Sequence, residues 1–253
     1  MNKYFFIKMI TSLNQSGLVA LFGITIYLLC SANLMAKNTS DPLTQLWYSL
    51  RSSIYVAPTE SQQQLNRELF AQVIDDKQIS QLINEKNAAN LVVASLQINE
   101  QQLIVLHEPL NALAGGGLYV FRQNGNGVLL QATHAFKDLH SGKIAINMML
   151  KGNYSGLAIN TVPRSYSVNG VSHDADMAHM KSSNFIDFSL AFAKAFPEDQ
   201  IVQLHGFNNK SRKQTQDTAM IISAGVKTID YKLTEQASCL NALVDEKVLT
   251  YPN

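Results

Sequence analysis

Apolar residues recur along the chain with two different periods. In residues 61–86 they include Leu65, Leu69 and Val73 at helical spacing, which predicts one or two amphipathic helices with a polar outer face. Short apolar runs of strand length follow, separated by polar or Gly-rich turns. These predicted strands are residues 91–98, 102–108, 117–122 and 127–133.

Beyond residue 140, predicted strands alternate with helices. Asn184 is expected to cap the first of two helices. The alternation predicts an α/β fold with a mixed, largely parallel sheet flanked by helices, to which the earlier hairpins add antiparallel strands at one side. The predicted helices are residues 184–196 and 233–248, and the predicted strands are residues 155–162, 201–207 and 219–225.

The first 36 residues differ from the rest of the chain. Lys3 and Lys8 come before an apolar run at residues 18–32, and small residues follow it, which is the order of parts in an export signal. A single uncleaved anchor is the alternative, because a run of about 15 residues is only slightly shorter than the roughly 17 to 25 that span a membrane. We therefore expect residues 1–36 to direct the protein to the periplasm or outside the cell. Residues 37–253 are expected to form a single α/β domain with a helical segment at its start.

Charge is nearly balanced, with 20 Lys and Arg against 19 Asp and Glu. Such a balance carries no electrostatic footprint for nucleic acid or for an anionic membrane. We expect a small-molecule or peptide substrate, no nucleic-acid partner, and no stable membrane partner beyond a possible N-terminal anchor. Cys239 is the one cysteine after the export signal, and we expect it to be a buried small hydrophobe rather than a nucleophile.

Three residues that can bind a metal stand at or near predicted strand ends. His134 directly follows one strand and His205 lies at the end of another, and ligands of open α/β sheets bind outside the carboxyl ends of the strands. Asp138 lies four residues after His134, which puts both side chains on one face of a helical turn. Two imidazoles and one carboxylate suit zinc and leave a fourth position for water. The sequence therefore predicts a zinc site with these three ligands.

Further histidines and carboxylates surround the predicted ligands in the sequence. His140 is an alternative second ligand, because it would share a face with His134 if the segment were extended. Residues 172–179 contain Asp176 and His179, and this segment could line the mouth of the site or form a second metal position. We expect His140, Asp176 and His179 to support the three ligands rather than to replace them.

Three short motifs carry a resemblance to a known group of enzymes. THAFKD (133–138), QLHGF (203–207) and AINTVPR (158–164) resemble elements of zinc-dependent hydrolases with the phosphorylase/hydrolase-like α/β fold. That group includes N-formylglutamate amidohydrolases, poly-γ-glutamate hydrolases and zinc carboxypeptidases. The resemblance implies that Asn160 and Arg164 hold a substrate carboxylate. The chain has His-x-x-x-Asp where the carboxypeptidases have His-x-x-Glu.

A zinc hydrolase also needs a carboxylate that moves the proton of the metal-bound water. Glu108 is one candidate because it ends a predicted strand, and Glu235 is the other because it follows the last histidine, as in the similar enzymes. The expected function is hydrolysis of an amide or peptide bond by an exported zinc enzyme. The substrate would be a small acyl-amino acid, a γ-glutamyl compound or a cell-wall peptide. The alternative is a non-catalytic exported metal- or ligand-binding protein of the same fold.

Overall fold

The structure is a computed structural model that describes residues 5–11, 41–75, 79–84, 89–98, 100–207, 218–225, 231–243 and 247–251. Its helices are α1 (Pro42–Ser49), α2 (Glu60–Ile74), α3 (Ile79–Asn84), α4 (Ser141–Lys151), α5 (Asn184–Ala195) and α6 (Tyr231–Leu243). Its strands are β1 (Phe5–Thr11), β2 (Val92–Ile98), β3 (Gln101–His107), β4 (Leu118–Phe121), β5 (Leu129–Ala132), β6 (Gly156–Ile159), β7 (Ser165–Val168), β8 (Val171–Asp174), β9 (Gln200–Gly206), β10 (Thr218–Ser223) and β11 (Lys247–Tyr251).

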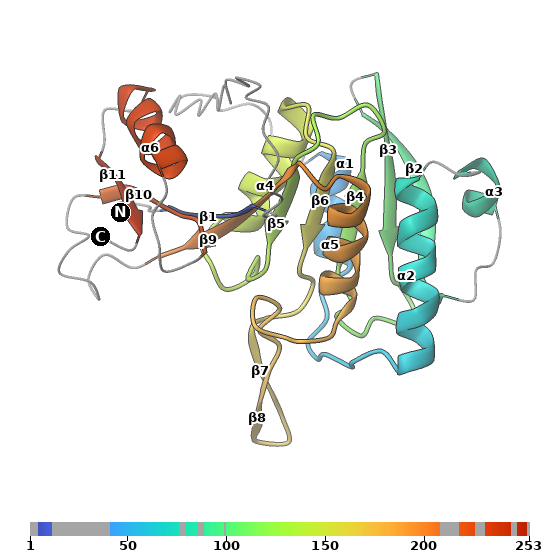
Figure 1. Cartoon of the computed structure of the whole chain (residues 1–253). Coiled ribbons are helices and arrows are strands. Elements are labelled where there is room, and N and C mark those ends of the chain that lie inside the picture. Colours follow the sequence, from blue (N-terminus) through green and yellow to red (C-terminus); the bar gives the residue numbers. More distant parts are fainter. Residues whose placement is uncertain are drawn as a thin grey trace.

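Nine of these strands form one mixed sheet in the order β11-β10-β1-β9-β5-β6-β4-β3-β2. The pairings of β5 with β6 and β9, and of β10 with β1 and β11, are parallel. The other four pairings in this sheet are antiparallel. The predicted α/β class with a mixed sheet flanked by helices is confirmed, with parallel pairings making up half of the sheet. Strands β7 and β8 form a separate hairpin that projects from the body (Figure 1).

Alternation along the strands builds a hydrophobic core on each face of the sheet. Leu130 of β5 belongs to the cluster that α1 and α4 cover, whereas its neighbour Leu129 belongs to the cluster under α2 and α5. Phe188 and Phe192 of α5 are almost completely buried in the second cluster. Burying a side chain of this size contributes about 1.5 to 3 kcal/mol. The two cores fix the middle of the sheet, where β5, β6 and β9 lie.

The predicted helical segment 61–86 becomes two helices, α2 and α3. The side chain of Thr59 caps α2 in a capping box with Gln62. Helix α5 is capped by Ser183, whose hydroxyl accepts from the backbone N–H of Ile186, so the predicted cap at Asn184 is wrong by one residue. Residues 247–251, partly assigned to a helix from the sequence, form β11 instead.

Strand β1 lies within the segment predicted to be an export signal. Its residues pair with β9 and β10, so β1 connects the outer strands β10 and β11 to the rest of the sheet. The apolar run 18–32 lies outside the described residues, and export remains a prediction. None of the helices in the described ranges has the length and apolar character needed to cross a membrane. Cys239 is exposed on α6, so the expectation that it is buried is wrong.

Candidate metal centre

The carboxyl ends of three parallel strands meet at one edge of the sheet. Ala132 at the end of β5 pairs in register with Ile159 at the end of β6, and Gln131 of β5 pairs with Gln203 of β9. His205, two residues beyond Gln203, therefore lies level with the first residues after β5. Open α/β sheets bind their ligands at this edge.

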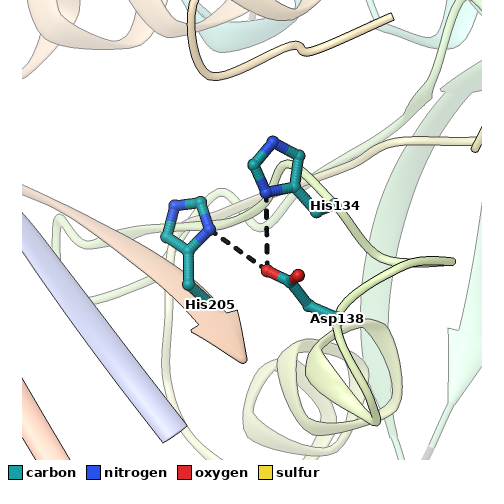
Figure 2. A group of neighbouring side chains, drawn as sticks. All are labelled: His134, Asp138 and His205. Atoms are coloured by element: carbon teal, nitrogen blue, oxygen red, sulfur yellow. Dashed lines mark hydrogen bonds and ion pairs between the residues drawn. The ribbon is translucent and has the colours of Figure 1, made fainter. Parts of the chain in front are cut away.

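One helical turn after β5 carries His134 and Asp138. The backbone N–H of Asp138 donates to the carbonyl of His134 over 2.8 Å, as the spacing of four residues predicts. The rings of His134 and His205 each direct a nitrogen toward the carboxylate of Asp138 (Figure 2). Their Nδ1 atoms lie 3.4 Å and 3.2 Å from Asp138 Oδ2. The potential ligand atoms of the three residues all lie within 4.8 Å of one another, so they form a group that could hold a metal ion.

The distances from the histidine nitrogens to Asp138 differ from the distance to Asp176. Two ligand atoms on a tetrahedral zinc ion, each roughly 2.0 to 2.1 Å from the metal, are about 3.3 Å apart. The two distances to Asp138 are close to this separation, and the 3.2 Å contact of His205 Nδ1 also has the length of a hydrogen bond. Asp176 Oδ1 instead lies 2.6 Å from His134 Nε2. Asp138 thus lies at a spacing that suits a fellow ligand, whereas Asp176 makes a short hydrogen bond with His134.

Asp176 supports His134 from the loop after β8. It accepts from Nε2 of His134, which leaves the lone pair of Nδ1 directed at the ligand group. Its other oxygen pairs with Arg164 Nη2 over 2.6 Å and with His179 Nδ1 over 2.9 Å. The predicted supporting residue Asp176 therefore contacts a ligand, whereas His179 contacts Asp176 and exposes 77% of its side chain.

Both carboxylates of the centre are held ionised. Burial alone raises the pKa of Asp138, but the contacts of its carboxylate with the His134 and His205 rings outweigh burial and hold that pKa well below its usual range. Burial also raises the pKa of Asp176, and hydrogen bonds with His134 and His179 lower it to about 2. Burial lowers the pKa of His134, yet its bonds with the two aspartates leave that pKa raised. A centre with two ionised carboxylates favours a cation.

The two predicted substrate residues have different surroundings. Asn160 is buried, its Nδ2 donates to the carbonyl of Thr133 and its Oδ1 accepts from the N–H of Val162. Asn160 therefore holds the backbone just before His134, and its role in substrate binding stays a prediction. Arg164 exposes 45% of its side chain while one nitrogen pairs with Asp176, so a role in substrate binding stays a prediction.

Neither predicted proton-transfer glutamate joins the centre. Glu108 follows β3 at the same edge of the sheet, but β4 and β6 lie between β3 and β5, so the two strands are three strand spacings, about 14 Å, apart. Its carboxylate accepts from the N–H of Ala114 and so closes the loop after β3. Glu235 is exposed on α6, which packs on β10 and β11. The strand order and the position of α6 leave both carboxylates outside the ligand group, and their role in proton transfer stays a prediction.

His140 does not belong to the ligand group. It is the residue before α4 and has a φ of 68°, a left-handed conformation that a residue with a side chain seldom adopts. Between the two alternatives for the second ligand, the described structure therefore favours Asp138.

Trp47, which sequence reasoning did not identify, and Gly206, which lies in the QLHGF motif, both shape the centre. Trp47 of α1 stacks on Phe136 with ring centroids 4.6 Å apart, and its Nε1 donates to the carbonyl of Asn160. Gly206 lies so close to the turn that an added Cβ would be 3.2 Å from the Cβ of Asp138. The glycine after a strand-end histidine was a visible signal, but nothing in the sequence connects Trp47 with a turn about 90 residues later.

Fold and site together define a candidate metal centre of two histidines and one aspartate at the carboxyl edge of a mixed α/β sheet. Comparisons of the chain with protein-family models, curated proteins and solved structures found no match. Function is therefore inferred from the chemistry of this centre.

Proposed function

We propose that His134, Asp138 and His205 bind a zinc ion and that the protein uses it to hydrolyse an amide or peptide bond. The observation that carries the proposal is the pair of distances from Asp138 Oδ2 to the two Nδ1 atoms, 3.4 Å and 3.2 Å. Two imidazole nitrogens favour zinc over calcium or magnesium, which prefer oxygen ligands. Three protein ligands leave a fourth position open.

The surrounding residues supply what a hydrolytic centre needs besides the ligands. When bound with an open position, zinc lowers the pKa of a water ligand to about 7. Asp176 keeps His134 in the orientation that presents Nδ1, and Asn160 fixes the backbone before it. Arg164 adds a half-exposed guanidinium beside the centre, a group that binds carboxylates. These features suit a substrate with a carboxylate near the scissile bond, such as an acyl-amino acid, a γ-glutamyl compound or a cell-wall peptide.

A second candidate function is metal or ligand binding without catalysis. The observation that favours it is the position of Glu108 and Glu235, which both lie away from the ligand group. Asp138 and Asp176, the carboxylates described at the centre, are engaged by histidines. A protein of this kind would bind zinc at the same three residues and release unchanged substrates.

Metal analysis and an amide panel test both candidates. The full chain should bind one zinc ion and cleave at least one of N-acyl-amino acids, γ-glutamyl amides and short peptides. Substitution of His134, Asp138 or His205 by alanine should remove both properties. His173→Ala, in the exposed hairpin, is the matched control and should keep them. Absence of zinc from the parent would overturn the proposal, and stoichiometric zinc without turnover would establish the second candidate.

The proposal also places the protein in the periplasm or outside the cell. The basic N-terminus and apolar run of residues 1–36 support this location. Fusions to reporters that are active only after export should be active, and a reporter active only in the cytoplasm would contradict it. The N-terminal mass of the protein then distinguishes a cleaved signal, whose removal takes β1 with it, from a retained anchor.

A further inference from the structure

One face of the central strands carries a buried row of polar side chains. Gln131 of β5 and Gln203 of β9 are neighbours in register and are both buried. Thr133 and His205 follow two residues later on the same face. The opposite face of the same strands is apolar, with Leu130, Ala132, Val202 and Leu204 in one cluster. Polar groups are costly to bury unless they are hydrogen-bonded, so the partners of this row matter.

The row forms a continuous hydrogen-bonded chain from α5 to the metal centre. The hydroxyl of Ser189 donates to the carbonyl of Phe185 over 2.6 Å, and Gln131 Nε2 donates to Ser189 Oγ over 2.6 Å. Gln203 Nε2 donates to Gln131 Oε1 over 2.7 Å. Gln203 Oε1 lies 3.5 Å from His205 Nε2 and thereby ends the chain.

The backbone carbonyl at the far end determines the direction of every bond in the chain. A carbonyl oxygen only accepts, so Ser189 must donate to it and can accept only from the amide nitrogen of Gln131. The oxygen of Gln131 then faces the nitrogen of Gln203, and the oxygen of Gln203 faces His205. To act as a hydrogen bond, this last contact, at 3.5 Å, needs a proton on Nε2 of His205. Thr133 Oγ1, 3.4 Å from the same nitrogen, can accept this proton too.

We infer that Gln203, Gln131 and Ser189 are positioning residues that keep the proton of His205 on Nε2, so that the lone pair of Nδ1 can bind the metal. The inference rests on the proposed metal centre for its purpose. Without such a chain, the carboxylate of Asp138, 3.2 Å from Nδ1, would draw the proton of the neutral ring to Nδ1 and block coordination. The chain thus acts on His205 from the interior of the sheet, without contact with the metal.

Two substitutions at different distances from the metal test the chain. In the full-length protein, Gln203→Met keeps the length of the side chain but removes the acceptor. Zinc affinity should fall by about 10- to 100-fold, the usual effect of losing a partner behind a metal ligand. Ser189→Ala removes the hydroxyl that sets the direction of the hydrogen bonds. The side-chain amides of Gln131 and Gln203 can then turn over, so that Gln203 presents an N–H to His205. Zinc affinity should then fall by about threefold to tenfold, although Ser189 touches no ligand.

The deciding measurement is the position of the proton on His205. Nitrogen chemical shifts of the neutral imidazole in the metal-free protein, assigned with His205→Ala, should show Nε2–H in the parent and a shift toward Nδ1–H in both variants. Val202→Ala, on the apolar face of β9, is the control and should change zinc affinity by less than about twofold. An unchanged tautomer in both variants would overturn the inference while leaving zinc binding intact. If the parent protein binds no zinc, the proposed function is overturned. The tautomer of His205 in the metal-free protein would still test the inference about the hydrogen-bonded chain.

Discussion

His134 and His205 present the same ring nitrogen to Asp138 but are held by different kinds of partner. Nε2 of His134 donates to the ionised Asp176, which also pairs with the half-exposed Arg164. Nε2 of His205 faces the neutral oxygens of Thr133 and Gln203 inside the sheet. Nε2 of His134 thus contacts a charged network that reaches the surface, whereas Nε2 of His205 faces uncharged side chains.

The difference follows from where each histidine lies. His134 stands in a turn, where a loop residue such as Asp176 can approach and its charge can be paired by a surface arginine. His205 lies within β9, where its Nε2 faces Thr133 and Gln203 and where a further ionised group would be costly to bury. Neutral amides that satisfy one another serve the same purpose there at lower cost. The comparison leads to four predictions.

Asp138→Ala should have the largest effect, because Asp138 is common to both halves of the centre. Removing it leaves two protein ligands, too few for the usual zinc set, so stoichiometric binding should be lost. Equilibrium dialysis against zinc measures this directly. Retained stoichiometric zinc in Asp138→Ala, together with its loss in His140→Ala, would show that His140 is the second ligand.

Asp176→Asn should come next, because it removes the charge behind His134 but keeps the shape of the side chain. Loss of such a partner weakens metal binding by about 10- to 100-fold. Asp174→Asn, in the exposed strand β8, is the control and should bind zinc as the parent does. If the partners of His134 and of His205 contribute equally to zinc binding, Asp176→Asn and Gln203→Met will weaken zinc binding to a similar extent. An Asp176→Asn protein with parental affinity would show that the charged network is not needed.

The parts of this centre that the sequence could predict are those set by local geometry. His134 and Asp138 are four residues apart in one turn, and His205 follows a recognisable apolar strand, so their meeting required only the α/β arrangement. Glu108 also follows a strand at the same edge, but its distance depends on β4 and β6 lying between β3 and β5, which no local pattern specifies.

Long-range hydrogen bonds account for most of the other differences between the centre predicted from the sequence and the centre in the structure. Asn160 has a structural role that the sequence did not suggest, because it satisfies backbone groups of two segments. Gln131 and Gln203 are about 70 residues apart, and their pairing depends on the β5–β9 register. Their places in apolar strands could have marked them as buried polar residues, although their partners could not be inferred without the fold.

The raised pKa of His134 predicts how zinc binding depends on pH. Zinc needs the neutral ring, so affinity should fall by about tenfold per pH unit once pH drops below that raised pKa. The folding stability of the metal-free protein depends on pH in the opposite sense. The raised pKa of His134 in the folded state stabilises the fold at low pH, and this stabilisation is lost as pH rises through that pKa. Dialysis at a series of pH values tests the first statement. In Asp176→Asn the fall should begin at lower pH, because a carboxylate that raises the pKa is gone; an unshifted profile would contradict this cause.

His140→Gly should have the smallest effect and tests whether the turn of His134 has a further support. At φ 68° a side chain costs about 1 kcal/mol, which glycine avoids, while the greater freedom of glycine in the unfolded chain offsets part of the gain. The free energy of unfolding of His140→Gly should therefore differ from that of the parent by less than about 1 kcal/mol. It should be larger than the free energy of unfolding of His140→Ala, because alanine keeps the left-handed strain.

Because His140 lies outside the ligand group, zinc affinity should stay within about threefold of the parent in both variants, well short of the roughly 10- to 100-fold loss expected for a supporting residue. Thermal unfolding and zinc competition measure the two quantities. A loss of that larger size in both variants would mean that the His140 imidazole supports the ligands, as the sequence suggested, and that the His134 side of the centre has a second support besides Asp176.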